Sequence, residues 1–355
     1  MDFPINRYFL KEPKELQTLD LCRGDDDFRK VYFVSDNEKK IVIKHSCNSF
    51  TDEKRIGGWM KLMEAYRELG IYCPRVVPAL DGRSVCSEII DGRVHYAFAE
   101  EFAAYETAEH IGSEKLKAED GNALYMPDML RALGKVAAAR LGLTEWHTAY
   151  CLLEPFCEPD TVDETTECAE KFVAKVKEIL PAYTERAETL LKLFYKVQGE
   201  LKERYSQLPC SCFQGDLNES NVLLDAEKRF VGLIDFNLCG SEPVLNYAVR
   251  EALWNVDDAC LYEEDDQCLH RLYLFDDTLD DLRIKSFLRN MGYVQEHYSF
   301  SEYERQVFPY LFRYVNSFWW HHISAIEEVK GDDEKVRKLF HWLEKQMTRD
   351  DIRLL

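Results

Sequence analysis

Short stretches of alternating hydrophobic and polar residues dominate the first hundred positions of the chain, as in strands buried on one side. Polar turns separate these stretches. Five of them are predicted to be strands, at residues 16–22, 31–34, 41–44, 85–90 and 94–99. One helix interrupts the series at residues 56–69, where apolar residues recur every three or four positions until Gly70 and Pro74 end it. This part of the chain is therefore predicted to be a sheet with a single helix.

The pattern becomes helical beyond about residue 127. Apolar residues have helical spacing over residues 129–141, 169–179 and 182–205, and the polar stretch 155–166 is predicted to be a surface loop. No internal repeat or low-complexity linker divides the chain. We therefore expect an α+β protein with two lobes, a β-rich lobe at residues 1–102 and a mainly helical lobe at residues 103–355.

The last of these helices is followed by the stretch CFQGDLNESNVLLDAEKRFVGLIDFNLCG. Two apolar runs in it, residues 222–224 and 230–234, flank a polar turn and predict a hairpin. Asp216 and Asn221 precede the first run and Asp235 follows the second, so the hairpin would present all three at one end. Phosphoryl transfer uses such residues, because a carboxylate orients and deprotonates a hydroxyl while amide and carboxylate oxygens hold magnesium.

The order Asp-Leu-x-x-x-Asn, apolar strand and Asp-Phe resembles the core of the aminoglycoside phosphotransferase and choline kinase-like family, which has a protein-kinase-like fold. The resemblance implies that Asp216 is the catalytic base and that Asn221 and Asp235 bind Mg²⁺. It also implies ATP as the phosphoryl donor. The alternative interpretation of the same residues is an exposed β-hairpin with acidic ends.

The chain departs from the family pattern at three positions near this core. Gln214 stands where members have His, Asn237 follows Asp-Phe where Gly is expected, and Asn246 stands where an aspartate often falls. None of these positions supplies a proposed base or metal ligand. The changes at Gln214 and Asn237, together with an uncertain glutamate on the predicted helix, nevertheless favour a second hypothesis from a different class, a nucleotide-binding pseudokinase or regulatory protein without turnover.

The resemblance extends to the predicted sheet. The segment IVIK ends in Lys44, which corresponds by order to the lysine that contacts the nucleotide phosphates. Glu101 and Phe102 lie where the family has the hinge between lobes, so their backbone would meet adenine. The predicted helix would carry the glutamate that pairs with Lys44. Glu53 and Glu64 are both candidates, and the pattern does not choose between them.

The expected activity is therefore ATP- and Mg²⁺-dependent phosphorylation of a hydroxyl group on a small molecule. Aminoglycosides, choline or ethanolamine, other amino alcohols and sugars all remain open as acceptors. A protein kinase is disfavoured, because the turn at Gly24 lacks the G-x-G-x-x-G loop and no Ala-Pro-Glu segment follows Asp235.

Composition restricts the partners and the compartment. The net charge of −20 opposes binding to nucleic acid and can attract a cationic small molecule, although solubility alone is the alternative explanation of the charge. No apolar run approaches the roughly 20 residues of a membrane helix, and the N-terminus does not resemble a signal peptide, so we expect a cytoplasmic protein that does not bind membranes. The twelve cysteines are scattered without a CxxC pair, which favours buried thiols over disulfides or zinc ligands. No pattern indicates an oligomeric state.

Two further groups of residues could belong to the acceptor site. Ten carboxylates lie within residues 257–281 and would suit an amine-bearing acceptor if they faced the site, whereas a solvated helix surface is the alternative. They are Asp257, Asp258, Glu263, Glu264, Asp265, Asp266, Asp276, Asp277, Asp280 and Asp281. An aromatic cluster could cage a quaternary ammonium or belong to the core. It comprises Phe312, Tyr314, Phe318, Trp319 and Trp320.

Overall fold

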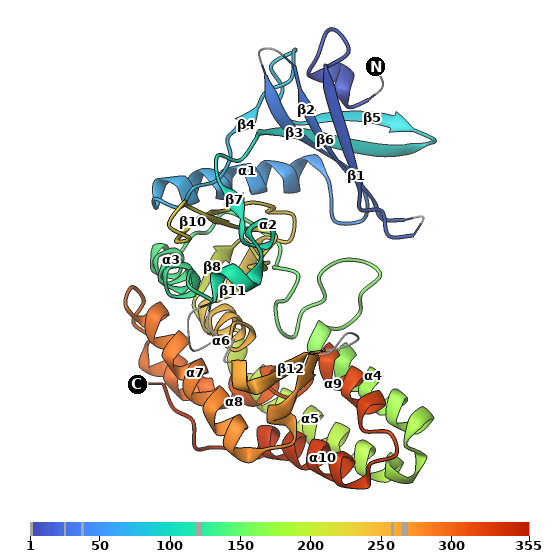
Figure 1. The fold of residues 1–355 in the computed structure, drawn as a ribbon, viewed down its shortest axis with the longest axis vertical. Helices are drawn as coiled ribbons and strands as arrows, with labels where there is room; N and C mark the ends of the chain where they lie inside the picture. Colours follow the sequence, from blue (N-terminus) through green and yellow to red (C-terminus); the bar gives the residue numbers. More distant parts are fainter. Residues whose placement is uncertain are drawn as a thin grey trace.

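The computed structural model describes residues 3–24, 26–36, 39–117, 123–256, 259–264 and 269–354. Figure 1 shows an elongated molecule with a β-sheet at one end, helices at the other end and small β elements between them. The expected α+β architecture, in which a β-rich part precedes a mainly helical part, is confirmed.

The β-rich part is an antiparallel sheet with the strand order β1-β2-β3-β6-β4, and β5 pairs with β6. The five predicted strands are all present, and three of them extend several residues beyond the patterns that predicted them. The strands are β1 (Glu15–Asp20), β2 (Phe28–Ser35), β3 (Lys40–Cys47), β4 (Val76–Val77), β5 (Cys86–Ile90) and β6 (Arg93–Glu101). Strand β4 was not predicted, because two residues are too few to show a period.

The two faces of the sheet have different environments because side chains alternate along each strand. Ile41 and Ile43 of β3 and Ala97 of β6 are buried in a small core with Tyr8 from the N-terminal segment. The opposite face carries Lys44, whose side chain reaches a carboxylate in the helical part of the molecule. The alternation along β3 thus places the Lys44 ammonium at the junction between the β-rich part and the helical part.

Helix α1 (Glu53–Glu68) lies between the sheet and the rest of the molecule (Figure 1). It begins three residues before the predicted start, because the Asp52 side chain accepts the backbone N–H of Arg55 at 2.7 Å and caps the helix. Its apolar stripe is buried as predicted, and Trp59 packs against Phe98 of β6 at a ring-centroid distance of 6.0 Å. The helix therefore joins the sheet to the main core.

The mainly helical part contains most of the buried apolar residues, in one continuous core. Its helices are α2 (Ala108–Ile111), α3 (Met126–Ala139), α4 (Glu164–Ile179), α5 (Thr184–Tyr205), α6 (Val244–Trp254), α7 (Asp277–Gln295), α8 (Glu302–Val315), α9 (Trp320–Glu328) and α10 (Asp333–Thr348). Short 3₁₀ helices lie at Ile5–Arg7, Ser113–Leu116, Pro181–Tyr183, Ala259–Leu261 and Leu272–Leu274.

The predicted surface loop at residues 155–166 is too long at its C-terminal end. Helix α4 begins at Glu164, where the Asp163 side chain accepts the backbone N–H of Thr166 at 2.9 Å. This N-cap interaction adds a turn that the apolar pattern alone did not indicate.

Small antiparallel sheets form the centre of the molecule. They pair in the orders β10-β9-β7, β11-β8 and β12-β13. Their strands are β7 (Glu106–Thr107), β8 (Cys210–Phe213), β9 (Val222–Leu224), β10 (Phe230–Leu233), β11 (Gly240–Pro243), β12 (Tyr262–Glu264) and β13 (Leu269–Arg271). Hairpin β9–β10 was predicted at these positions, and its pairing is confirmed.

The described cysteines are all free thiols, most of them buried. Among the helices that the structure describes, none is both long enough and apolar enough to cross a bilayer.

The β-rich part is attached to hairpin β9–β10 through its backbone. Tyr72 lies just after α1, and its N–H and C=O form hydrogen bonds with Val231 and Leu233 of β10, at 2.8 and 2.9 Å. Gly232 lies between these two contacts. A Cβ atom at Gly232 would be 2.0 Å from the Tyr72 carbonyl oxygen, so a side chain there cannot be accommodated without moving the backbone.

We predict that Gly232→Ala lowers the free energy of unfolding by about 1–3 kcal/mol, since the added methyl group overpacks this contact. Urea denaturation measures the change. Gly199→Ala is the matched control, because Gly199 lies exposed in α5 and a methyl group added there would have nothing within 4 Å of it. It should be neutral or stabilising, by up to about 1 kcal/mol. Equal stability of the two variants would contradict the close approach.

Candidate active site

The loops before and after hairpin β9–β10 bring three predicted residues together. The backbone N–H of Ile234 donates to the carbonyl of Asn221 at 3.0 Å, which makes Asn221 and Asp235 neighbours at the end of the hairpin. The side-chain amide of Asn221 donates both to the backbone carbonyl and to Oδ2 of Asp216, each at 3.0 Å. Asp216, Asn221 and Asp235 therefore share one end of the hairpin, although five and then fourteen positions separate them in the chain.

Gln214 holds the two loops against each other. Its side-chain NH₂ group donates to the carbonyls of Ile234 and Asp235, at 3.0 and 2.6 Å, and its Oε1 accepts the N–H of Asp216 at 2.7 Å. The side chain is fully buried. In the sequence, this position stands out only because the family histidine is missing. In the structure, the amide there connects the loop of Asp216 directly to the loop of Asp235.

Gly215 completes the turn that presents Asp216. Its φ of +96° lies in a region that L side chains rarely adopt, and a Cβ atom would be 2.3 Å from the Leu238 carbonyl oxygen. Only glycine fits between the two loops at this point.

The carboxylate of Asp216 is half-buried, and burial raises its pKa. The negative charge of Asp235 raises this pKa further, while hydrogen bonds from Asn218 and Asn221 oppose the increase. A carboxylate with a raised pKa is a better proton acceptor than an ordinary aspartate. This environment suits a group that takes a proton from a hydroxyl.

Lys44 reaches this end of the hairpin from β3. Its Nζ lies 3.3 Å from Oδ1 of Asp235 and 3.4 Å from Oε2 of Glu100. Burial alone would lower the pKa of Lys44, but the two carboxylates outweigh it and raise that pKa above its ordinary value. The lysine is therefore held as a cation at the junction of the sheet and the hairpin.

The partner of Lys44 is neither of the two glutamates that the sequence suggested. Glu64 pairs with Arg67 on α1, and Glu53 lies exposed in the first turn of that helix. Glu100 comes from β6, the strand next to β3, and is 4% exposed. Its position in the sheet, facing the same side as Lys44, could have been inferred from the alternation along β6.

Glu101 and Phe102 lie at the end of β6, where the sheet connects to the rest of the molecule. The N–H of Glu101 already donates to the carbonyl of Arg75 at 2.8 Å. The Phe102 ring is 39% exposed, and the Lys40 ammonium lies 3.8 Å from its centroid. The backbone N–H of Glu101 is thus already hydrogen-bonded within the protein, and the next residue, Phe102, has an exposed ring.

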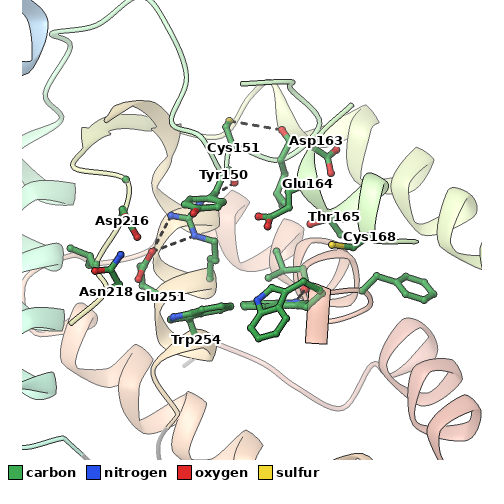
Figure 2. A pocket seen from close by; sticks show the side chains of 18 residues that line it. Tyr150, Cys151, Asp163, Glu164, Thr165, Cys168, Asp216, Asn218, Glu251 and Trp254 are labelled. Carbon is green, nitrogen blue, oxygen red and sulfur yellow. Dashed lines mark hydrogen bonds and ion pairs between the residues drawn. The ribbon is translucent and has the colours of Figure 1, made fainter. Parts of the chain in front are cut away.

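A cavity of about 250 Å³ opens on the other side of Asp216. Figure 2 shows Asp216 and Asn218 on one side of it and Glu164 projecting into it from α4. We call it the acceptor cavity. Its polar wall is formed by Tyr150, Asp163, Glu164, Asp216, Arg250 and Glu251, and its aromatic wall by Trp254, Phe318, Trp319 and Trp320.

The predicted aromatic cluster is divided by the structure. Phe312 and Tyr314 are buried in the core, which confirms the core interpretation for them. Phe318 also belongs to the core, because it is 1% exposed although it touches the acceptor cavity, whereas Trp319 and Trp320 line the cavity as an aromatic cage would. The sequence pattern did not indicate Trp254, which also lines the cavity from the end of α6 and is 48% exposed. An exposed tryptophan at a helix end would have been its only signal.

The predicted acidic wall at residues 257–281 is wrong for the residues that can be placed. Asp276 caps α7, Asp277 pairs with Lys345 at 2.7 Å and Asp280 is buried under cationic side chains. None of the described carboxylates of this segment lines the acceptor cavity. Asp257, Asp258, Asp265 and Asp266 lie outside the described residues, as does the side chain of Glu264. The carboxylates of the cavity come instead from α4, α6 and the loop of Asp216.

Arg250 organises the floor of the cavity. Its guanidinium lies 3.0 Å from Glu251 and 3.5 Å from Glu242, and it donates to the carbonyl of Tyr150 at 3.0 Å. Burial raises the pKa of Glu242 to about 7, and the neighbouring Arg250 opposes this increase. Asn246 and Thr148 also donate to Glu242. Asn246 therefore stabilises the buried Glu242 by a hydrogen bond. An aspartate at this position, as the family often has, would add a second negative charge beside Glu242.

Glu164 differs from the other carboxylates of the cavity because it has no hydrogen-bond or ion-pair partner among the described residues. Asp163 accepts hydrogen bonds from Thr166 and Tyr314, and Glu251 is paired with Arg250. Burial by the cavity walls raises the pKa of Glu164, and Arg250 opposes this. It is the carboxylate of the cavity that remains available to a ligand.

The donor set at the hairpin fits a magnesium ion that is shared with a nucleotide. Mg²⁺ prefers oxygen ligands and usually binds one or two carboxylates together with phosphate oxygens. Asn221 and Asp235 offer such oxygens. In the part of the chain that the structure describes, no three His, Cys, Asp or Glu side chains converge as a metal cage. A metal here would therefore depend on phosphates as additional ligands.

A buried lysine facing a hairpin that presents Asp, Asn and Asp beside a cavity defines a small-molecule phosphotransferase with a kinase-like fold. The family model for the phosphotransferase enzyme family matches residues 19–246, which is more than half of the chain. The chain belongs to this family, and it is a small-molecule kinase. No curated protein sequence matches it.

Solved structures share this fold at low sequence identity. A microcompartment-associated aminopropanol kinase aligns with a TM-score of 0.53 and 13% identity over 97% of this chain and 93% of that chain. An amicoumacin kinase in complex with AMP-PNP and Ca²⁺ gives 0.48 and 14% over 97% and 91%. An aminoglycoside phosphotransferase from Alicyclobacillus acidocaldarius gives 0.44 and 12%, again over 97% and 91%. The structural likeness rests on the first of these.

We predict that Gln214→Leu lowers both stability and turnover. The substitution introduces an apolar side chain of similar size and leaves two buried carbonyls and one N–H without a partner. This loss should lower the free energy of unfolding by about 1–3 kcal/mol. Urea denaturation and kcat measure the two effects. Gln214→His should retain more activity, because a ring can still bridge the loops. Gln207→Leu, at an exposed position, is the control and should change neither quantity. Wild-type turnover in Gln214→Leu would contradict this role.

Proposed function

We propose that the protein transfers the γ-phosphoryl group of ATP, with magnesium, to a hydroxyl group of a small molecule. One observation carries the proposal. Asp216 lies between the Asn221–Asp235 end of the hairpin and the acceptor cavity, within hydrogen-bonding distance of Asn221 and at the cavity wall. A group in that position can contact an acceptor on one side while phosphates occupy the other side.

The nucleotide would bind between the sheet and the hairpin. Lys44 would contact the α- and β-phosphates, and Asn221 and Asp235 would provide the metal ligands. The backbone near Glu101 and Phe102 would lie beside adenine. A magnesium ion bound there supplies charge neutralisation for the phosphates. Glu100 would keep Lys44 oriented when Asp235 turns to the metal, since both carboxylates contact the ammonium.

Asp216 would orient the acceptor hydroxyl and receive its proton. The acceptor oxygen then forms the new bond to the γ-phosphorus as the bond to the β–γ bridging oxygen breaks, which leaves ADP. The carboxylate must be ionised to accept the proton, and its raised pKa makes the ionised form a stronger base.

The pseudokinase hypothesis makes a different prediction, tight nucleotide binding without hydrolysis or acceptor turnover. Two of its motivations have a structural answer. Gln214 ties the loops together in place of histidine, and Glu100 pairs with Lys44 in place of a helix glutamate. Slow ATP hydrolysis that Asp216→Asn abolishes would favour the kinase.

We predict that Asp216→Asn lowers kcat by at least about 100-fold while magnesium-dependent nucleotide binding persists. For the wild type, kcat/KM should fall as pH drops through the pKa of Asp216. Because that pKa is raised, the decline should begin above the ordinary aspartate value of about 3.9. A pH–rate profile with ADP release as the readout measures it.

Asp235→Ala is the complementary variant, and it should lose magnesium-dependent nucleotide binding in calorimetry with the fold intact. If the wild type binds no nucleotide with any divalent metal, the proposal is wrong. A pH profile that is flat down to the ordinary aspartate range would contradict the role of Asp216 alone.

The acceptor class is proposed from the same cavity. An amine-bearing or quaternary ammonium acceptor would meet Glu164, which has no partner among the described residues, and the exposed faces of Trp254, Trp319 and Trp320. A cation gains from a carboxylate and from aromatic faces where water is excluded. The overall charge of −20 would attract such a compound from solution.

We predict that an ADP-release screen over aminoglycosides, choline, ethanolamine, amino alcohols and sugars finds its best substrates among amines. Glu164→Gln should then raise KM for that acceptor about tenfold or more, with a smaller change in kcat. Asp277→Asn is the charge-matched control, since Asp277 pairs with Lys345 outside the cavity. A neutral sugar as best acceptor, or equal KM values in both variants, would refute the cationic assignment.

A further inference from the structure

A second pocket lies behind the acceptor cavity, and Trp254 and Trp319 form a wall common to both. Their rings stack at a centroid distance of 5.0 Å with an interplanar angle of 14°. We call this second space the back pocket. Its volume is about 80 Å³, enough for a small ion or a few waters. Its polar lining includes Arg271, Tyr273, Arg283, His321 and His322.

His322 contributes an N–H donor without an acceptor. Its Nδ1 accepts the backbone N–H of Trp319 at 3.0 Å, and burial lowers the pKa of the ring well below its usual range. The neutral ring must therefore carry its proton on Nε2. That atom is buried and has no partner among the described residues. A buried donor in this state needs an acceptor from outside the protein.

His321 contributes a second such donor, through a chain of hydrogen bonds. Arg271 can only donate and lies beside the Tyr273 hydroxyl, which favours the arrangement in which that hydroxyl donates to Nε2 of His321, 3.3 Å away. The proton of the neutral His321 ring then lies on Nδ1. This nitrogen is also buried without a partner among the described residues, and the ring is 8% exposed.

Arg271 leaves the pocket with an excess of positive charge. Arg283 is balanced by Asp280, at 3.0 Å, and donates its remaining Nη1 to Asn316. Within the described part of the chain, Arg271 has no carboxylate within ion-pairing distance. Its guanidinium instead lies 5.3 Å from the centroid of Trp320, at the edge of the acceptor cavity.

The other polar side chains of the pocket already form hydrogen bonds within the protein. The Tyr262 hydroxyl donates to the Val256 carbonyl, the Trp342 indole donates to Asp280, and Oδ1 of Asn316 is taken by Arg283. A water molecule brings two protons that need acceptors of their own, whereas a carboxylate brings only acceptors and a phosphate brings more acceptors than protons. The lining therefore suits an anion better than water.

We propose that the back pocket binds a small oxyanion, a carboxylate or phosphate group, through the free N–H groups of His321 and His322 and the guanidinium of Arg271. The binding site is separate from the catalytic residues and does not depend on the proposed phosphotransfer. Because the pocket shares the Trp254–Trp319 wall with the acceptor cavity, and His322 holds the backbone of Trp319, an anion there would stiffen one wall of the acceptor site.

The test titrates the full-length protein, without nucleotide, with inorganic phosphate and with acetate at constant ionic strength. Trp254, Trp319 and Trp342 line the pocket, so saturable changes in tryptophan fluorescence should report binding. Arg271→Gln should weaken the affinity at least tenfold. Arg305→Gln removes the same charge from an exposed site on α8 and should leave the affinity unchanged. In ¹⁵N-histidine spectra of the unmodified protein, ring nitrogens of two buried histidines should shift with the same affinity.

No saturable response to either anion, or equal affinities in Arg271→Gln and Arg305→Gln, would overturn the proposal. Loss of phosphate binding in Lys44→Gln but not in Arg271→Gln would also overturn it, by assigning the ion to the nucleotide site. Acceptor kinetics distinguish the two sources of the anion. Competition between phosphate and the acceptor would show that the anionic group belongs to the acceptor itself, whereas a non-competitive change in rate would show that a free ion binds.

Discussion

The geometry of the candidate active site depends on one buried amide. Gln214 satisfies two carbonyls of the Asp235 loop and the N–H of Asp216 at once, and no other described side chain connects these loops in this way. Gly215 makes the connection possible, because a larger residue would collide with the Leu238 carbonyl. A general base and a metal ligand must keep a fixed separation for in-line transfer. For Asp216 and Asp235, the proposed base and metal ligand, that separation is maintained by the scaffold behind the two carboxylates rather than by contact between them.

The parts of the fold that could be predicted from sequence are those that local pattern controls. The sheet strands and helix α1 show a period of two or about 3.6 over enough residues to be recognised, and hairpin β9–β10 shows two apolar runs around a polar turn. The grouping of Asp216, Asn221 and Asp235 followed from that hairpin, since residues that flank paired strands must meet at its end. The Asp163 cap and the two residues of β4 were missed because their signals involve only one or two positions.

The rest of the site depends on contacts between distant segments, which spacing does not reveal. Glu100 pairs with Lys44 because β6 lies beside β3, and Glu164 enters the acceptor cavity because α4 packs near the loop of Asp216. The acidic run at residues 257–281 shows the opposite case. Its charges are dense in sequence, but Asp276 caps a helix, and Asp277 and Asp280 pair with basic side chains of α10 and α7. Density of charge along a chain does not determine which way the charges face.

The ion pair between Lys44 and Asp235 has a consequence for how the two parts of the molecule move. It joins residues 191 positions apart, and it lies in the space proposed for the nucleotide. Nucleotide binding would then be an exchange reaction, in which the Lys44–Asp235 ion pair is replaced by contacts with the nucleotide. The net affinity is the difference between the two, so an unusually strong internal pair would make the empty protein rigid and the ligand weakly held. Glu100 would reduce the cost of breaking the pair, because it stays beside the Lys44 ammonium when Asp235 moves away.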